Sequence, residues 1–336
     1  MNSEGILKLF ALGLKRTTIG LVLLFAVLVL CFLLMHLAPG DVADTIAQNS
    51  GGLDPEVMEQ IRKDYGLDLP FWQQLLKYLS RVIVLDLGHS FYYNQPVTDL
   101  IFDKLPATLL LVISAQIVSI TLGVFLGVMA SKKPNGLTSH FVTVLSLLGY
   151  AAPVFWTGIM LIILFASIIP IFPIGNMVDV SVEREGFAYI LDVLHHLVLP
   201  TLTLSSIFLA LYSRLARASM LDVLGSDYVR TAQAKGLSEF QVTFKHALRN
   251  ALLPVVTTVG LVFSSLMSGA VLVEAVFSWP GLGTLAVQSI VARDTPTILG
   301  ILFFSSLVVI VANLVTDLVY RIVDPRINTS DNSMIR

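Results

Sequence analysis

Residues 226–237 read SDYVRTAQAKGL and begin a polar, basic island, residues 226–254, which is set between two long apolar runs. Ser226 or Asp227 can cap a helix, because a short side-chain oxygen there accepts a hydrogen bond from a free backbone N–H. The residues that follow favour a helix, and Gly236 stands where a left-handed residue ends one without steric penalty. The stretch therefore predicts a short helix, a sharp turn and a second helix between two membrane spans.

The composition is that of a protein that crosses a membrane several times. The 336 residues are 55% hydrophobic and only 13% charged, whereas soluble domains carry about 25% charged residues. The formal net charge of −2 gives no electrostatic reason to expect a nucleic-acid partner. The single cysteine, Cys31, excludes an intrachain disulfide.

An apolar helix of about 20 residues crosses the hydrocarbon core of a bilayer. We expect six such spans, at residues 18–37, 107–130, 134–178, 193–213, 250–273 and 295–316. For the first of them, a cleaved signal peptide is the alternative. Its apolar stretch is too long for a signal peptide, and no small-residue cleavage site follows it.

The uncharged residues 134–178 are long enough for one interrupted span or for two. Two crossings would place the basic loop 214–249 outside, against the positive-inside rule. We therefore expect one crossing, interrupted near residues 149–153, where Pro153 removes a backbone donor and bends the helix. Both termini are then cytoplasmic.

Residues 38–104 are the one large polar segment of the chain. Within them, apolar residues recur at helical spacing in residues 54–65 and 70–83. In the six-span topology this segment is extracytoplasmic, so we expect a small helical domain on the membrane surface. A structured loop without a binding role is the alternative.

A weaker pattern concerns the packing of helices in the membrane. Gly123 and Gly127 form a small-xxx-small pair, which lets another helix approach closely.

His195 and His196 precede the fourth span and could belong to a metal site. Adjacent histidines on a helix point apart, however, so an interfacial role is the preferred interpretation.

The polar island resembles the "EAA" loop of ABC-importer permeases, and closely its variant in the peptide and nickel permease family. Arg230, Thr231 and Ala232 stand where the general motif has Glu-Ala-Ala, and Gly236 stands at its glycine. The resemblance implies a coupling helix seated in a groove of an ATPase subunit, with Ala232 packed in that groove. It assigns ATPase coupling to Asp227, Tyr228, Arg230, Thr231, Ala232, Ala234, Lys235, Gly236 and Leu237. The alternative is an ordinary cytoplasmic loop.

A second motif follows the fifth span. Glu274 and the sequence FSWPGLG at residues 277–283 resemble the Glu-x-x-Phe-x-x-Pro-Gly-Leu-Gly signature of the same family. Proline and two glycines force a tight turn, in which Gly281 is expected to take a positive φ. The segment is a candidate outer gate, formed by Glu274, Phe277, Trp279, Pro280, Gly281 and Gly283. The alternative is an interfacial turn whose glutamate is solvated.

Asn313 is added to the pathway residues because it lies on the last span. Asp317 follows it by four residues on the same helix face. An ionisable group in a span faces protein or water rather than lipid. For Asp317, a structural ion pair with Arg321, four residues further on, is the preferred interpretation.

The resemblance runs from residues 37–41, LAPGD, to residues 324–326, DPR. It implies an all-α polytopic protein with six transmembrane helices, a MetI-like permease core and an extracytoplasmic helical insertion after the first helix. The expected parts are residues 1–37 (cytoplasmic start and first span), 38–104 (extracytoplasmic segment), 105–325 (core, with coupling loop 214–249) and 326–336 (cytoplasmic tail).

The resemblance also implies a function and a set of partners. The chain is expected to be one permease subunit of a bacterial inner-membrane ABC importer for peptides or a related small solute. Its expected partners are a second homologous permease, two ATPase subunits that bind ATP and Mg, an extracytoplasmic solute-binding protein and the lipid bilayer.

Sequence motifs bear on catalysis as well. The chain contains no phosphate-binding loop and neither the HExxH nor the GxSxG motif, so we expect no enzyme activity and no cofactor of its own. The alternative function is a stand-alone secondary transporter or channel, which needs no docking loop. The identity of the solute is left open.

Overall fold

The structure is a computed structural model, and it describes residues 3–37, 54–90 and 92–323. Residues 38–41 and 324–326, which carry both ends of the family resemblance, lie outside the described residues, as does the tail 326–336. The chain forms two compact units, unit 1 (Met1–Pro106 and Gly281–Val311) and unit 2 (Ala107–Pro280 and Ala312–Arg336). The expected boundaries at residues 38 and 105 follow membrane topology instead and stay a prediction.

The described residues of unit 1 form helices and one short hairpin. It contains α1 (Ser3–Leu37), α3 (Pro55–Tyr65), α4 (Phe71–Ile83), the antiparallel strands β1 (His89–Ser90) and β2 (Gln95–Pro96), and α12 (Leu282–Val291). The two helices expected from the periodicity of residues 54–65 and 70–83 are therefore confirmed as α3 and α4. Pro55 opens α3 and Gly66 ends it at a φ of 70°, the usual positions of these residues at helix termini.

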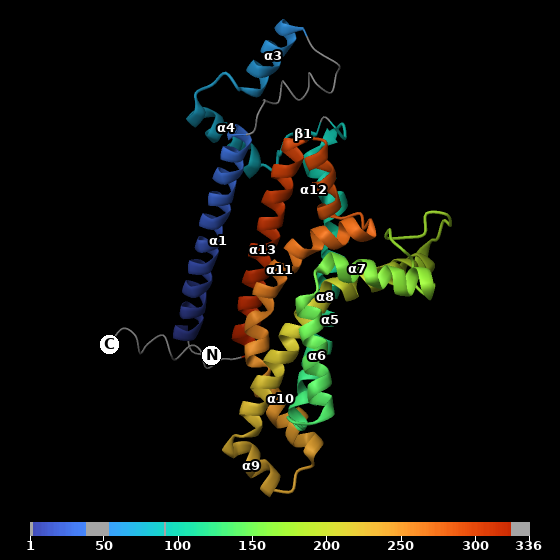
Figure 1. Cartoon of the computed structure of the whole chain (residues 1–336). Helices are drawn as coiled ribbons and strands as arrows, with labels where there is room; N and C mark the ends of the chain where they lie inside the picture. The colour runs from blue at the N-terminus through green and yellow to red at the C-terminus, as the bar shows by residue number, and fades with distance from the viewer. Residues whose placement is uncertain (1–2, 38–53, 91, 324–336) are drawn as a thin grey trace. The chain divides into compact units, whose positions relative to one another are not determined.

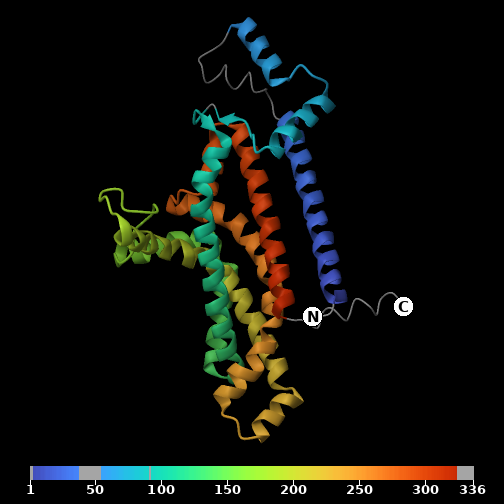
Figure 2. The ribbon, with the colours of Figure 1, turned by 180° about the vertical axis from the view of Figure 1, so that it is seen from behind.

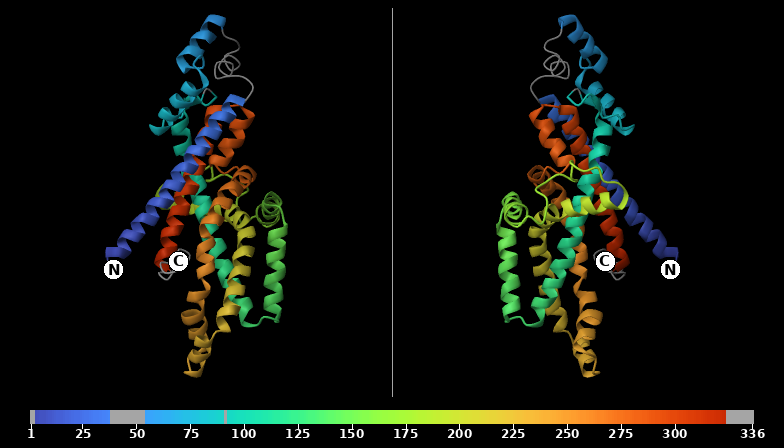
Figure 3. Two further views of the ribbon diagram at one scale, coloured as in Figure 1. Left: turned by 90° about the vertical axis from the view of Figure 1, so that its left-hand side faces the viewer. Right: turned by 90° about the vertical axis from the view of Figure 1, so that its right-hand side faces the viewer.

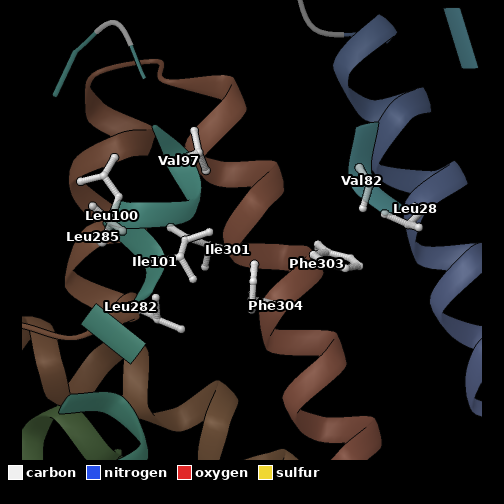
Figure 4. Close-up of a cluster of buried hydrophobic side chains, with 10 residues drawn as sticks. All are labelled: Leu28, Val82, Val97, Leu100, Ile101, Leu282, Leu285, Ile301, Phe303 and Phe304. Carbon is white, nitrogen blue, oxygen red and sulfur yellow. The ribbon is translucent and has the colours of Figure 1, made fainter. Parts of the chain in front are cut away.

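A buried apolar cluster holds unit 1 together, and Figure 4 shows its side chains. Its members come from α1, α4, α12 and from the parts of α5 (Val97–Lys132) and α13 (Thr295–Val323) that belong to this unit. They are Leu28, Val82, Val97, Leu100, Ile101, Leu282, Leu285, Ile301, Phe303 and Phe304. At its edge, Val82 of α4 lies beside Leu28 of α1 (Figure 4).

Unit 2 contains most of α5 and the helices from α6 to α11, drawn in green to orange in Figures 1 and 2. These are α6 (Leu137–Ala151), α7 (Val154–Ile162), the π-helix η1 (Ile163–Ile168), α8 (Gly186–Leu224), α9 (Asp227–Ala234), the π-helix η2 (Gln241–Ala247), α10 (Leu248–Ala251) and α11 (Leu253–Phe277). The last part of α13 completes the unit.

The predicted interruption of the third span is present. The helix Leu137–Ala151 and the helical stretch Val154–Ile168 meet at Pro153 with a bend of 107° (Figures 1 and 3). Apart from this pair, five helices of the described chain are long and apolar enough to cross a membrane, and the bent pair raises the number to six if it is one span. The exact count of six spans stays a prediction.

The expected close packing at the glycine pair of α5 is confirmed. A Cβ atom on Gly123 would lie 2.7 Å from the Cβ of Tyr212, and one on Gly127 would lie 2.6 Å from the carbonyl oxygen of Ser213. Real side chains do not approach so closely, so only glycine allows α8 to contact α5 here.

Candidate functional site

The first part of the polar island, residues 226–237, forms α9 and the turn after it, as the sequence predicts. Ser226 is the N-cap, and its carbonyl accepts the N–H groups of Val229 and Arg230, each at 3.2 Å. The expected side-chain cap is wrong, because the Ser226 hydroxyl instead donates to the carbonyl of Val223 at 2.5 Å. That carbonyl belongs to the last turn of α8, where helix carbonyls lack an intrahelical donor.

Gly236 ends the coupling helix in the predicted way. Its φ is 78°, its N–H donates to the carbonyl of Gln233 at 2.9 Å, and the N–H of Leu237 reaches the carbonyl of Ala232 at 3.4 Å. No atom lies within 4 Å of where a Cβ of residue 236 would sit. The requirement for glycine here is therefore conformational rather than steric.

The inner face of α9 packs against this chain. Val229 is fully buried and Ala232 is 7% exposed. Both belong to an apolar cluster, which we call the α9 cluster, with Val128, Met220, Val242, Ala247 and Ala251. The expectation that the Ala232 side chain fills a partner's groove is therefore wrong. Residues 229 and 232 lie three apart on one helix face, and that face points inward.

The outer face of α9 is exposed. Its side chains include Asp227, which is 99% exposed, and Arg230, which is 71% exposed and lies 3.7 Å from the Asp227 carboxylate. Thr231 and Ala234 share this face and are exposed, as are Lys235 and Gly236 in the turn. These residues are free to contact another protein, in contrast to Ala232.

Two apolar side chains extend this surface beyond the turn. Leu237 is 36% exposed and Phe240 is 68% exposed. Phe240 was not among the expected coupling residues, although an aromatic residue at the start of the second helix was a usable signal. We call the exposed set of Asp227, Arg230, Thr231, Ala234, Lys235, Leu237 and Phe240 the knob surface.

A hydrogen bond ties α9 to the helices that follow it. Asn250 on α10 donates from Nδ2 to the hydroxyl oxygen of Tyr228 at 2.8 Å. Together with the α9 cluster, whose members Ala247 and Ala251 precede α11, this bond joins the knob surface to the start of a membrane-spanning helix. The outer face of α9 and the start of α11 are therefore connected by packed contacts.

At the other end of α11, Glu274 is fully buried. Its Oε1 accepts a hydrogen bond of 2.6 Å from the hydroxyl of Thr108 on α5. Trp279 is also fully buried, and its indole Nε1 donates to the carbonyl of Ala107 at 2.9 Å. The alternative of a solvated glutamate is therefore wrong, because the carboxylate of Glu274 and the indole N–H of Trp279 are both satisfied inside the protein.

Phe277 joins this turn to the loop between η1 and α8. Its carbonyl accepts the N–H of Asn176 at 2.8 Å, and a Cβ on Gly175 would lie 2.5 Å from the same oxygen. The Phe277 ring contacts Gly158 of α7, where a Cβ would lie 3.2 Å from it. Three segments of unit 2 thus meet at Phe277, the loop at its carbonyl and α7 at its buried ring.

The turn takes its sharp geometry from a residue that sequence reasoning did not select. Ser278 has a φ of 51°, whereas Gly281 has φ −102° and ψ −173°. The expected positive φ at Gly281 is wrong, because this glycine is the extended N-cap of α12. Pro280 is half-buried and Gly283 is buried within α12.

Asn313 packs against α11 inside unit 2. Its Oδ1 lies 2.6 Å from where a Cβ on Gly260 would sit, beside the side chain of Thr316 at 3.2 Å. The residue is half-buried between two helices. The predicted partner of Asp317, the side chain of Arg321, lies outside the described part of the structure.

An ionic cluster at the start of α8 was not expected from the sequence. Asp192 is 4% exposed, pairs with the guanidinium of Arg184 and accepts the backbone N–H of Asp179 at 2.9 Å. His195 bonds through Nε2 to the carbonyl of Ile171 at 2.9 Å. Within the residues that the structure describes, no group of three or more His, Cys, Asp or Glu side chains could hold a metal ion.

Comparison with known proteins agrees with this arrangement. The family model "Binding-protein-dependent transport system inner membrane component" matches residues 119–329, and its N-terminal companion model matches residues 9–112. The oligopeptide transport system permease protein AppB of Bacillus subtilis is 39% identical over 318 residues, which cover 93% of this chain and 98% of that protein. The dipeptide transport system permease protein DppB of Escherichia coli is 38% identical over 331 residues, 94% of this chain and 97% of that protein.

A solved structure supports the fold. A chain of the inward-facing MetNI methionine ABC transporter superposes with a TM-score of 0.54 at 15% identity, covering 67% of this chain and 96% of that chain. The expected MetI-like, all-α fold is therefore confirmed. The chain belongs to the family of binding-protein-dependent transport system inner membrane components, the permeases of ABC importers.

Proposed function

We propose that this chain forms half of a peptide pathway across a bacterial inner membrane, in an importer driven by ATP hydrolysis on separate subunits. Support for the cargo comes from the relatives AppB and DppB, whose names specify oligopeptide and dipeptide transport. A related small solute is the alternative cargo. The chain itself holds neither ATP nor Mg and is not an enzyme, since both groups belong to the ATPase partners.

The observation that carries the proposal is the construction of α9. Its inner face is anchored in the α9 cluster, and its outer face is exposed and polar, with Asp227 and Arg230 among its residues. A short helix that is firmly held on one side and free on the other is suited to transmit the movement of a bound partner. We assign this partner to one of two ATPase subunits.

The route of transmission follows from the contacts. Binding of ATP closes the two ATPases and displaces α9, and the Tyr228–Asn250 bond with the α9 cluster carries the displacement to α11. The far end of α11 carries Glu274, whose bond to Thr108 on α5 is the candidate element of the outer gate. Two arrangements of these helices, biased by nucleotide, give alternating access.

We propose the remaining partners on the basis of the family resemblance. A second homologous permease completes the pathway, and an extracytoplasmic binding protein delivers the solute. In this topology both termini and the loop 214–249 are cytoplasmic, and residues 38–104 are extracytoplasmic. The lipid bilayer surrounds the spans.

The decisive experiment compares Ala234 on the outer face with Ala232 on the inner face. Ala234→Glu is compatible with a helix and exposed, so the free energy of unfolding should change by less than about 0.5 kcal/mol. It should nevertheless weaken recovery of the ATPase subunits about tenfold, which corresponds to about 1.4 kcal/mol. Ala232→Glu should instead destabilise the permease itself, because it forces an unpaired carboxylate into the α9 cluster.

The measurements are subunit stoichiometry after purification and ATPase activity with and without binding protein loaded with a di- and tripeptide mixture. If the Ala234→Glu variant retains the wild-type subunit stoichiometry and the wild-type stimulation of ATPase activity, the knob surface does not dock the ATPase subunits. Solute flux through the purified chain alone would favour the stand-alone transporter or channel.

A further inference from the structure

The helix α4 presents three chemically different faces, which follow from about 100° of rotation per residue. One face packs into unit 1, where Val82 is 3% exposed and Tyr78 contacts the buried cluster. A second face carries Gln74, Lys77 and Arg81, which line a pocket of about 110 Å³. This pocket is lined as well by residues of α1, of the segment after α4 and of the first turn of α13.

The third face is apolar and exposed. Trp72 is 59% exposed, Leu76 is 58% exposed and Ile83 is 81% exposed, and these positions fall on one stripe of the helix. Val84 directly follows the helix and is 73% exposed. We call Trp72, Leu76 and Ile83 the α4 stripe. A contiguous stripe of large apolar side chains marks a surface that is covered in the working protein.

The position of α4 along α1 indicates what covers the stripe. The apolar window of α1 that qualifies as a membrane span runs over Thr17–Leu34. Within this window, Leu28 packs with Val82 near the end of α4, and Phe32 contacts Phe71 at 5.2 Å between ring centroids. The helix α4 therefore lies alongside the last turns of a membrane span rather than beyond them (Figures 1 and 4).

The exposed surface of α1 at this level is apolar too. Leu30 is 54% exposed and Leu34 is 46% exposed, so large apolar side chains are exposed on α1 as well as on α4. The polar face of α4 points elsewhere, towards the pocket, where Arg81 pairs with Asp86 at 2.8 Å. This ion pair lowers the pKa of the Asp86 carboxyl below its usual value. The side chains of Arg81 and Asp86 are 40% and 46% exposed, and an exposed ion pair is compatible with water on that side and not with lipid.

We propose that α4 is an interfacial membrane helix, whose stripe of Trp72, Leu76 and Ile83 is immersed in lipid at the boundary between headgroups and acyl chains. Tryptophan is enriched at this depth, because its ring is apolar and its N–H is polar. An amphipathic helix with one apolar face binds in this plane. The proposal rests on α1 being a span and not on the coupling role of α9.

Immersion of α4 in lipid has a mechanical consequence for unit 1. An immersed α4 fixes the end of α1 against the bilayer, and the apolar cluster of unit 1 links both helices to α12 and α13. The membrane surface then restrains the position of the polar segment that follows α1.

Spin labels test the depth of the stripe in the full complex, reconstituted into vesicles of phosphatidylcholine and phosphatidylglycerol. In a Cys31→Ala background, Leu76→Cys and Ile83→Cys carry labels on the stripe, and Ser80→Cys carries one on the exposed polar side of the same helix. Leu34→Cys on α1 is the lipid-facing reference. Collision rates with oxygen, which partitions into lipid, and with a water-soluble nickel chelate report the environment of each label.

We expect labels at 76 and 83 to resemble the label at 34, with a several-fold higher oxygen-to-nickel ratio than the label at 80. If the nickel chelate collides with the labels at 76 and 83 as often as with the label at 80, the stripe lies in water and the proposal is overturned. If neither oxygen nor the nickel chelate reaches the labels at 76 and 83, a protein such as a second permease covers the stripe. This result overturns the proposal as well.

A second measurement uses the unlabelled protein. Brominated phosphatidylcholine should quench the tryptophan fluorescence of the complex, and Trp72→Phe should remove part of this quenching. The chain has three tryptophans, and Trp156→Phe, which removes a half-exposed ring from the third apolar region, serves as the reference for a tryptophan on a membrane span. Quenching that is unchanged by Trp72→Phe would contradict immersion of the stripe.

Discussion

Thr108 on α5 donates a hydrogen bond of 2.6 Å to Glu274 on α11, and both side chains are almost completely buried. The two residues are 166 positions apart in the sequence, so the bond joins two distant membrane-spanning helices. A carboxyl group in a span is costly unless protein groups satisfy it. The pair therefore joins α5 to the last turns of α11 through a buried hydrogen bond, and its part in the outer gate is the proposal that the first prediction tests.

The first prediction concerns this bond. Thr108→Val keeps the shape of the side chain and removes the donor, which should cost about 1–3 kcal/mol because a buried acceptor loses a partner. We expect a lower melting temperature of the purified complex and reduced peptide uptake. Thr108→Ser, which restores a hydroxyl, should recover much of both.

Thr121 on the same helix supplies the matched control for Thr108. It is exposed, and its hydroxyl donates to the carbonyl of Ile117 at 2.7 Å within the helix. Thr121→Val should therefore change neither melting temperature nor uptake appreciably. Equal behaviour of Thr108→Val and Thr121→Val would mean that the bond to Glu274 has no part in the gate.

The second prediction concerns transmission from α9. Tyr228→Phe and Asn250→Ala each remove the 2.8 Å hydrogen bond between these residues. If the bond carries coupling, a double-mutant cycle should give an interaction energy of about 0.5–3 kcal/mol in the stimulation of ATPase activity by loaded binding protein. Tyr189→Phe, at an exposed tyrosine of α8, should leave stimulation unchanged. Strictly additive effects of the two changes would exclude the bond from the transmission route.

The third prediction concerns the turn after α9. Gly236 has a φ of 78°, so Gly236→Ala should destabilise this turn by about 1–2 kcal/mol through backbone strain alone. Asparagine tolerates this conformation better, so Gly236→Asn should retain more transport than Gly236→Ala. The control is Gly225→Ala, since Gly225 has a φ of −77° and its Cβ would make only an ordinary contact of 3.5 Å. Equal transport in Gly236→Ala and Gly225→Ala would contradict the requirement for a left-handed residue.

The fourth prediction concerns topology. In a Cys31→Ala background, Gln60→Cys on α3 should react with an impermeant thiol reagent added to intact cells. Phe240→Cys on the knob surface should react only after the membrane is opened. Both positions are exposed in the structure, so a failure to react reports membrane sidedness rather than burial. The reversed labelling pattern would refute the six-span topology with cytoplasmic termini.

Much of the fold could be predicted because its causes are local. Stretches of about 20 apolar residues have to be helical in a membrane, where no water satisfies the backbone. Pro153 interrupts the third apolar region with a bend of 107°, because proline lacks the N–H that continues a helix. The left-handed conformation of Gly236 is equally local, since only glycine adopts it without strain.

The tertiary structure decided which faces and which partners these residues have. The side chain of Ala232 packs inside the α9 cluster, whereas that of Ala234 is exposed. The positive φ occurs at Ser278 rather than at Gly281, and Glu274 is buried against Thr108. Each outcome depends on segments far away in the sequence that pack against these positions. Local propensities fix where a helix begins and ends, whereas its rotation and its buried hydrogen bonds follow from close packing with distant neighbours.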